Sequence, residues 1–311
     1  MIKVKFMTDS YAALTADFTT LVDFLRFGLT QARAADLYYG HGTDNAWDDM
    51  MALVLGSLSL PPDVDPLLLQ AQLTPAEKQM LNERLARRII DKVPVPYLTR
   101  EAYFCELPFY VDERVLIPRS PIAELIREQF SPWLVADNVE RVLDLCTGSG
   151  CIAIACSYAF PEAVVDAVDI SAEALEVAAI NRDRHGLQDV LNLIESDCWA
   201  NVPGVRYDLI VSNPPYVGYE EMQTLPDEYT HEPRLALECE NNGLAIVEKI
   251  LANAHDYLTE EGILVVEVGN SEYALVDAFP QLPFTWLDFE HGGQGVFLLT
   301  CQQLKAYFGN K

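Results

Sequence analysis

Residues 142–153 read Val-Leu-Asp-Leu-Cys-Thr-Gly-Ser-Gly-Cys-Ile-Ala, an apolar segment that runs into a glycine-rich turn and then into a second apolar segment. We interpret the three parts as a strand, a turn and the start of a helix. Gly148 and Gly150 let the backbone turn tightly and let a ligand approach where a side chain would obstruct it. Because open α/β sheets bind ligands at the carboxyl ends of their strands, this stretch predicts a cofactor site.

Strand-like and helix-like segments alternate around this stretch. Helical periodicity is clearest over residues 172–185 and 244–258. The expected strands cover residues 141–145, 163–168, 190–194, 207–211, 262–268, 284–289 and 295–299. The alternation predicts an α/β domain with a parallel, seven-stranded sheet that has helices on both faces. Since the last two strands follow each other closely, we expect an antiparallel hairpin at the sheet edge.

Acidic residues accompany the first three expected strands: Asp144 near the end of the first, Asp169 at the tip of the second, and Asp197 after the third. A carboxylate at residue 144 repels a pyrophosphate, which argues against a dinucleotide-binding loop and for a cationic ligand. Asp169 can accept two hydrogen bonds from a ribose diol. The alternative is that Asp169 caps the next helix, but Ser171 can supply that cap. We expect Asp197 to bind an adenine amino group and Trp199 to cover the adenine ring.

The tetrapeptide Asn213-Pro214-Pro215-Tyr216 follows the fourth expected strand, at the same sheet edge as the glycine turn. The alternative of a plain turn is disfavoured by the acids and glycines upstream. Two prolines fix the backbone, which suits a site that holds a planar amide or amine in one pose. The side-chain oxygen of Asn213 and the backbone oxygen of Pro214 can accept both N–H groups of a carboxamide, and Tyr216 can pack on its plane.

The two acceptors address a specific chemical difficulty. A carboxamide nitrogen is a poor nucleophile because its lone pair is delocalised into the carbonyl group. Acceptors that hold its N–H groups favour a localised lone pair facing an activated electrophile, such as a sulfonium methyl group. The protein then supplies mainly proximity and alignment. No acid–base pair is needed, and the histidine that follows the tetrapeptide, His231, is well removed in sequence.

The region before residue 100 has a helical pattern, with apolar periodicity over 17–35 and 47–58. In a third helix, Thr74 is the expected N-cap, Pro75 the first residue and Glu77 the reciprocal capping partner. We expect Pro94 and Pro96 to end this region.

Aromatic and β-branched residues before and after the acidic pair Asp112-Glu113 suggest a β-hairpin with strands over 102–111 and 114–117. The chain is therefore expected to comprise a helical domain over 1–100, a hairpin linker over 101–119 and the α/β domain over 120–311.

The chain of 311 residues carries 47 acidic and 21 basic residues, a formal net charge of −26. Such a surface disfavours binding to nucleic acids and anionic membranes and attracts a basic partner, unless the acidity serves only solubility. No apolar run approaches the roughly 20 residues of a membrane span, and no apolar segment after Met1 to Lys5 suggests a signal peptide.

The seven cysteines form no Cys-x-x-Cys pair, so we expect reduced thiols in a cytoplasmic protein and no metal site. Cys146, Cys151 and Cys156 are interpreted as small buried hydrophobic residues.

At these motifs the sequence resembles the glutamine N(5)-methyltransferases of the translation machinery, over nearly the whole chain. The matching segments are 116–119, 144–150, 213–216, 232–233, 236–237, 262–269 and 292–293. The resemblance implies a class I methyltransferase fold with a Rossmann-like, seven-stranded sheet, S-adenosyl-L-methionine as cofactor and a substrate glutamine on Asn213 to Tyr216. By position, it places the cofactor against Cys146, Thr147, Gly148, Ser149, Gly150, Asp169, Trp199 and Asn213.

Two branches of this family differ at two places. The release-factor branch typically reads Pro-Arg-Pro followed by an acid, Thr and Glu, whereas residues 118–124 read Pro-Arg-Ser-Pro-Ile-Ala-Glu. Cys146 stands where the release-factor branch has Gly. Both features resemble the branch that acts on the large-subunit ribosomal protein L-three. That resemblance implies a basic ribosomal protein as substrate and the N-terminal helices as the part that recognises it.

Three alternatives stay open from the sequence. The first is the same reaction on peptide chain release factors. The second is an adenine-N6 DNA or RNA methyltransferase, because Asn-Pro-Pro-Tyr also presents exocyclic amino groups; such enzymes need a basic track, which this chain lacks. The third is a non-catalytic ribosome assembly factor that has kept the fold.

Overall fold

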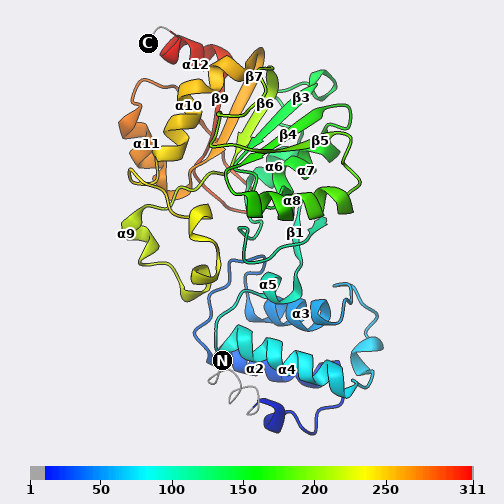
Figure 1. Cartoon of the computed structure of the whole chain (residues 1–311). Coiled ribbons are helices and arrows are strands. Elements are labelled where there is room, and N and C mark those ends of the chain that lie inside the picture. Colours follow the sequence, from blue (N-terminus) through cyan, green and yellow to red (C-terminus); the bar gives the residue numbers. More distant parts are fainter. Residues whose placement is uncertain (1–10, 310–311) are drawn as a thin grey trace. The chain divides into compact units, whose positions relative to one another are not determined.

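The computed structural model describes residues 11–309 (Figure 1). The expectation that no signal peptide follows Met1 lies outside these residues. The chain divides into two compact units. The helical unit consists of Met1–Ala102, Val111–Glu113 and Pro226–His231, and the α/β unit consists of Tyr103–Tyr110, Arg114–Leu225 and Glu232–Lys311.

The helices of the helical unit are α2 (Leu21–Ala34), α3 (Ala46–Ser57), α4 (Pro75–Ile89) and α5 (Val95–Thr99), with 3₁₀ turns η1 (Leu68–Gln70) and η3 (Asp227–His231). The predicted capping box of α4 is confirmed, because Thr74 Oγ1 accepts from the Glu77 amide and the Glu77 carboxylate accepts from the Thr74 amide. The prediction that Pro94 and Pro96 end the helical region was wrong. Both prolines lie at the start of α5, where a missing N–H and a fixed φ are tolerated.

The core of the helical unit joins apolar side chains from three helices. Phe24, Met50, Leu53, Leu81 and Leu85 are all inaccessible to solvent. They come from α2, α3 and α4, and their burial follows the spacing that the sequence showed.

A hairpin of β1 (Ala102–Phe104) and β2 (Leu107–Phe109) forms a small separate sheet. The predicted strand over 114–117 is absent, and Asp112-Glu113 is not the turn. The turn is Cys105-Glu106, with φ of 48° and 65°. Positive φ at both central residues gives a two-residue turn whose twist matches that of the flanking strands.

The main sheet of the α/β unit has seven strands in the order β5-β4-β3-β6-β7-β9-β8. The strands are β3 (Arg141–Leu145), β4 (Val164–Asp169), β5 (Leu191–Glu195), β6 (Tyr207–Ser212), β7 (Leu258–Glu267), β8 (Thr285–Trp286) and β9 (Val296–Thr300). Strands β3 to β7 pair in parallel. The predicted antiparallel hairpin is confirmed, because β9 pairs antiparallel with both β7 and β8. The edge strand β8 is shorter than expected and pairs on one side alone.

The helices of this unit are α6 (Ile122–Arg127), α7 (Cys151–Ala159), α8 (Ala172–Arg184), α9 (Tyr219–Met222), α10 (Ala245–Tyr257), α11 (Glu272–Ala278) and α12 (Cys301–Phe308). Three short 3₁₀ turns accompany them, η2 (Ala136–Asn138), η4 (Arg234–Ala236) and η5 (Gly269–Ser271).

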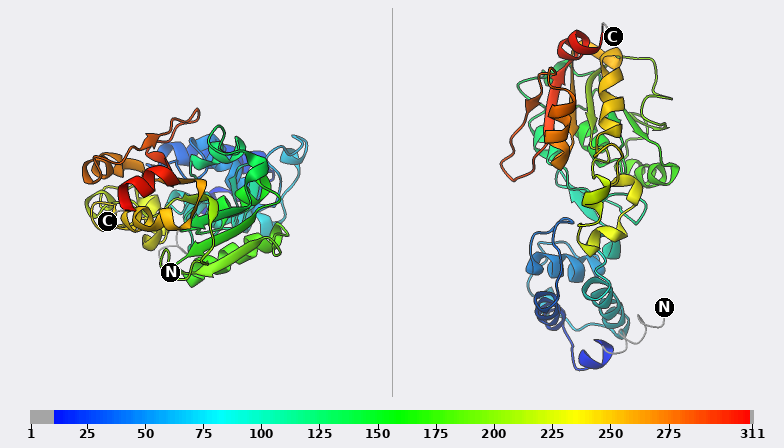
Figure 2. Two further views of the ribbon diagram at one scale, coloured as in Figure 1. Left: turned by 90° about the horizontal axis from the view of Figure 1, so that it is seen from above. Right: turned by 90° about the vertical axis from the view of Figure 1, so that its left-hand side faces the viewer.

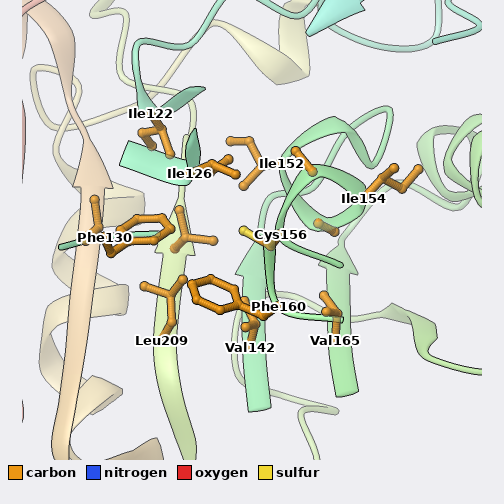
Figure 3. Packing of buried hydrophobic residues seen from close by; sticks show 14 of the residues in the cluster. Ile122, Ile126, Phe130, Val142, Ile152, Ile154, Cys156, Phe160, Val165 and Leu209 are labelled. Atoms are coloured by element: carbon orange, nitrogen blue, oxygen red, sulfur yellow. The ribbon is translucent and has the colours of Figure 1, made fainter. Parts of the chain in front are cut away.

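Two apolar layers cover the two faces of the sheet. On one face, α6 and α7 pack against β3, β4 and β6, with Phe130 stacked on Phe160 at 6.3 Å between ring centroids (Figure 3). On the other face, α10 and α12 lie side by side against β7 (Figure 2). The predicted α/β sheet with helices on both faces is therefore confirmed. Cys151 and Cys156 are buried as predicted, whereas Cys146 is only half-buried.

The chain reverses its direction across the sheet between β3 and β6. From β3 it proceeds through β4 to β5 on one side, and from β6 it proceeds to β7 on the other. Such a switch point, at the carboxyl ends of two adjacent parallel strands, is where open α/β sheets bind ligands. Among residues 11–309, no helix combines the length and apolar character needed to span a bilayer.

Candidate active site at the switch between strands β3 and β6

The glycine turn and the tetrapeptide begin at neighbouring points of the sheet. Strands β3 and β6 pair in parallel with Leu145 opposite Ser212. Residues 146–150 follow Leu145, and Asn213 follows Ser212. The expectation that both motifs lie at the same sheet edge is therefore confirmed.

Asp144 stabilises the conformation of the glycine turn through two hydrogen bonds. Its Oδ2 accepts hydrogen bonds from the Thr147 hydroxyl at 2.6 Å and from the Ala153 amide at 3.1 Å. It thus joins the turn to the first part of α7. Along the turn, Cys146 and Gly148 have φ of 62° and 55°, in the left-handed region that favours glycine.

The second oxygen of Asp144 has no such anchor. The residue is fully buried, and Oδ1 has no hydrogen-bond partner in the part of the chain that the structure describes. Burial raises the pKa of Asp144 to about 7, against the opposing hydrogen bonds from Thr147 and Ala153. A carboxyl group of this kind would gain from a nearby cationic or hydrogen-donating ligand, since a buried acceptor without a partner is costly.

Asp169 ends β4 beside the turn. Its Oδ2 accepts from the Gly148 amide at 2.8 Å, and its Oδ1 accepts from the Ser171 amide at 2.9 Å. Burial raises the pKa of Asp169, while these backbone hydrogen bonds oppose the shift. The side chain of Ser171 caps α8 by accepting from the Ala174 amide at 3.1 Å, as the sequence predicted. Asp169 is half-buried, so its carboxylate can still receive a ligand.

Asp197 and Trp199 both contact one residue of α10, Lys249. The exposed carboxylate of Asp197 pairs with Lys249 Nζ at 3.2 Å. Trp199 Nε1 donates to the Lys249 carbonyl oxygen at 2.9 Å, and the indole stacks on Tyr257 at 4.6 Å between centroids. Because Tyr257 covers one face of the indole, an adenine ring would have to use the other face or its edge.

Two backbone hydrogen bonds fix the chain directly after the tetrapeptide. The Val217 amide donates to the Leu237 carbonyl, and the Cys239 amide donates to the Val217 carbonyl, each at 2.9 Å. Pro214 is buried, while Asn213 and Tyr216 are half-buried. The tetrapeptide is therefore a rigid segment with side chains that remain accessible.

Two further connections near the site were not assigned from the sequence. The buried Glu232 accepts from both terminal nitrogens of Arg119, at 2.6 and 2.7 Å, and from the Ile117 amide at 3.0 Å. These residues belong to the segments 116–119 and 232–233 that carried the family resemblance. That resemblance was the sequence signal that could have assigned them to the site.

Asn181 of α8 makes the other connection. Its Nδ2 donates to the carbonyl oxygens of Ser149 at 2.9 Å and of Tyr110 at 3.0 Å, and its Oδ1 accepts from the Tyr110 amide at 2.7 Å. This fully buried amide joins the glycine turn to the chain that follows the hairpin. Nothing in the sequence pattern distinguishes it from a surface residue of α8.

His231 does not belong to the unit that carries the glycine turn and the tetrapeptide. It belongs to the segment Pro226–His231 of the helical unit, where its Nε2 lies 2.7 Å from the Asp91 carbonyl oxygen. Within residues 11–309, no group of three or more His, Cys, Asp or Glu side chains is arranged to hold a metal ion.

The site has the features that a nucleoside ligand with a cationic centre requires. An added Cβ at Gly148 would meet nothing within 4 Å, so there is open space at this point of the turn. The half-buried carboxylate of Asp169, which accepts from the Gly148 amide, provides negative charge beside the turn, and the buried Asp144 keeps one oxygen without a hydrogen-bond partner among residues 11–309. The residues present therefore fit such a ligand.

The chain is similar to known methyltransferases. Residues 129–230 match the family described as Methyltransferase small domain. A protein of Francisella tularensis subsp. tularensis named ribosomal protein uL3 glutamine methyltransferase is 46% identical, over 93% of this chain and 92% of its own length. A protein of the same name from Neisseria meningitidis serogroup B is 47% identical, over 93% and 95%.

The fold is also similar to a solved structure, the hMettl16 catalytic domain in complex with a MAT2A 3'UTR hairpin. The two superpose with a TM-score of 0.51 and 15% sequence identity, over 62% of this chain and 75% of the other. This likeness concerns the fold alone, which is that of class I methyltransferases. The cofactor of this methyltransferase family is S-adenosyl-L-methionine, as the resemblance implied. With nearly half of its residues shared over almost the full length of both relatives, the chain belongs to the family of ribosomal protein uL3 glutamine methyltransferases.

Proposed function

We propose that this chain methylates the side-chain amide nitrogen of a glutamine in ribosomal protein uL3, which is the large-subunit protein L-three. The observation that carries the proposal is the pairing of Leu145 with Ser212, which starts the glycine turn and the Asn-Pro-Pro-Tyr segment side by side. The names of the two relatives support the substrate. The net charge of −26 supports a basic protein partner.

We assign cofactor binding to the turn and to the acids around it. S-adenosyl-L-methionine supplies a methyl group already activated on a sulfonium centre. Asp169 would accept the two ribose hydroxyl groups, and Asp144 would favour the cationic part. The complete set that we propose is Asp144, Cys146, Thr147, Gly148, Ser149, Gly150, Asp169, Asp197, Trp199 and Asn213.

We assign the reacting amide to the tetrapeptide. Asn213 Oδ1 and the Pro214 carbonyl oxygen would accept the two amide N–H groups and turn the nitrogen lone pair towards the methyl group. Pro215 keeps the backbone in one conformation, and the Tyr216 ring would lie on the amide plane. The nitrogen would gain the methyl group as the methyl–sulfur bond breaks and leaves a neutral thioether, and it would then lose a proton to solvent, so no side chain has to act as a base.

We further propose that residues 1–100 form the substrate-recognition domain, residues 101–119 a linker with the hairpin, and residues 120–311 the catalytic domain. The activity would belong in the cytoplasm, which the seven free cysteines support. We expect no direct binding to nucleic acid and no membrane attachment, because the chain is strongly acidic.

The test is methyl transfer from labelled S-adenosyl-L-methionine to purified uL3, to a purified release factor and to a DNA oligonucleotide, in parallel reactions. The proposal requires label on uL3 and, by mass spectrometry, one added methyl group on a glutamine. Label on the release factor alone would move the chain to the other branch of the family. Label on DNA alone, or none anywhere, would refute the proposed reaction.

A further inference from the structure

Tyr216, the last residue of the tetrapeptide, is held by hydrogen bonds at two distant points. Its hydroxyl donates to Glu267 Oε1 at 2.9 Å. Its backbone carbonyl oxygen accepts from the Ser271 hydroxyl at 2.9 Å. The aromatic ring lies between these two anchors, so its orientation depends on both.

The ring also packs directly against backbone. An ideal Cβ placed on Gly269 would lie 2.5 Å from Cε2 and 2.9 Å from Cζ of Tyr216. Real Cβ atoms do not approach ring atoms so closely, so this position requires glycine. Packing against Gly269 limits the ring on one side, and the hydroxyl bond to Glu267 fixes its tip.

Glu267 is a rigid anchor because it ends β7 and is buried. Strand β7 pairs with β6, with Val266 opposite Ser212, so the carboxylate belongs to the strand beside the tetrapeptide. The other oxygen of the carboxylate, Oε2, accepts from the Ser120 hydroxyl at 2.6 Å. Burial raises the pKa of Glu267, whereas the two hydroxyl donors and the charge of Arg119 oppose that shift.

We propose that Glu267 is a positioning residue for methyl transfer, which holds the Tyr216 ring on the plane of the substrate amide through the tyrosine hydroxyl, with Ser120 orienting its carboxylate. The inference rests on the proposed function for the role of Tyr216. The hydroxyl anchor itself is a property of the chain alone. Fixing the ring limits how far the amide nitrogen can turn away from the methyl group, and small misplacements of reacting groups are expensive in rate.

The first test needs no substrate. Fluorotyrosine is incorporated into the full chain, and Tyr216→Phe assigns the fluorine resonance of residue 216. Glu267→Ala should shift and broaden this resonance, because the ring loses its anchor. Glu267→Gln should leave it close to its original position, since the glutamine carbonyl can still accept from the tyrosine hydroxyl and Ser120 can accept from the amide.

A matched control exists elsewhere in the same sheet. The Tyr207 hydroxyl donates to the buried Asp166 at 2.7 Å, so this pair has the same chemistry away from the tetrapeptide. Asp166→Ala should move the resonance of Tyr207 and leave that of Tyr216 in place. A Tyr216 resonance that is equally insensitive to Glu267→Ala would overturn the proposal.

The second test measures kinetics with purified uL3 and labelled cofactor. Glu267→Ala and Tyr216→Phe should each lower kcat about 10- to 100-fold with the cofactor Kd unchanged, and Glu267→Gln should recover most of the loss. The double variant Tyr216→Phe/Glu267→Ala should be no slower than the slower single variant, because both remove one interaction. Asp166→Ala should keep its kcat per folded molecule.

The outcomes separate the two proposals. Wild-type kcat in Glu267→Ala, or a double variant whose loss is the product of the single losses, would contradict a positioning role that acts through Tyr216. If the wild-type protein does not methylate uL3, the proposed substrate fails. In that case the fluorine spectra alone decide whether Glu267 anchors the ring.

Discussion

The Ser212 hydroxyl donates a hydrogen bond to the Leu145 carbonyl oxygen at 2.7 Å. These are the last residues of β6 and β3, so the bond closes the sheet at the point where the two site segments leave it. The glycine turn and the tetrapeptide are therefore carried by one rigid edge.

The residue after Ser212 provides the most direct test of the proposed chemistry. Asn213→Ala should lower kcat about 100- to 1,000-fold, the usual effect of removing one preorganised hydrogen-bonding group from a reacting centre. The cofactor Kd should stay near the wild-type value, as measured by calorimetry. Asn253→Ala, on the exposed side of α10, serves as the control and should change neither quantity. Equal rates in wild type and Asn213→Ala would refute the assigned role.

Asp169→Ala should raise the cofactor Kd about 100-fold, because two charge-assisted hydrogen bonds to the ribose are lost. Since burial raises the pKa of Asp169, cofactor binding should weaken on acidification at a higher pH than for an ordinary aspartate. Calorimetric titrations across the acidic range check both statements. Asp183→Ala, at an exposed position of α8, should bind the cofactor like wild type.

The pKa of Asp144 leads to a prediction about stability. Its folded-state pKa of about 7 lies above the ordinary value of 3.8, so the folded protein holds this proton more tightly than the unfolded chain does. The contribution of Asp144 to the free energy of unfolding is therefore largest below about pH 4, decreases as pH rises through about 7, and is level above that.

Asp144→Asn should remove this dependence. At pH 8 the cofactor-free variant should be more stable than wild type by an amount on the order of a few kcal/mol, because no charge is buried. The same variant should bind the cofactor more weakly, since the attraction to the cationic part is lost. Urea unfolding at pH 5 and pH 8 tests the first statement and calorimetry the second. A wild type whose stability rises relative to Asp144→Asn over this range would contradict the shifted pKa.

Asn181 is predicted to couple stability to cofactor binding. Asn181→Leu should lower the free energy of unfolding by about 3 kcal/mol, because three buried hydrogen bonds to the backbone of Tyr110 and Ser149 are lost. The cofactor Kd should rise as the turn loses its support. Val177→Ala removes apolar contact from the same helix and should lower stability alone. Matching cofactor affinities in the two variants would argue against the coupling.

The helical unit has its own buried charge network. Arg88 Nε lies 2.7 Å from the Asp49 carboxylate and Arg88 Nη1 lies 3.3 Å from the Glu228 carboxylate, with all three side chains almost inaccessible. Arg88→Met should destabilise this unit by about 3–5 kcal/mol, since two buried carboxylates lose their counter-charge. Arg100→Ala breaks the exposed pair with Glu113 and should cost less than about 1 kcal/mol. Thermal unfolding followed by circular dichroism distinguishes the two variants.

The strands of the main sheet were predictable because each is an apolar run closed by turn residues. The sequence placed β3 at residues 141–145, as the structure does, and placed β4 to β7 and β9 within a few residues. Parallel strands are buried on both faces, so their signal is local and strong. The predictions of the edge strand β8 and of the hairpin were less accurate. Few buried residues define an edge, and the conformation of Cys105-Glu106 is set by the fit of the turn to its strands.

The residues of the candidate site were likewise predictable only in part. The residues of the turn and the tetrapeptide could be found from the sequence because glycine and proline restrict the backbone locally. The hydrogen bonds of Asn181, Glu232 and Glu267 could not be predicted, because each joins residues that are far apart in sequence. The expected role of Trp199 depends likewise on a ring, Tyr257, that lies far away in sequence.

The amino-acid sequence alone thus determined the α/β architecture, the positions of most strands along the chain and the two motifs that carry the chemistry, since all of these follow from local apolar pattern and backbone restriction. The tertiary structure alone decided how far Asp144 is buried, which carboxylate meets the Tyr216 hydroxyl and which segments join the helical unit. Burial and pairing are properties of residues brought together by packing, and no pattern within a single segment records them.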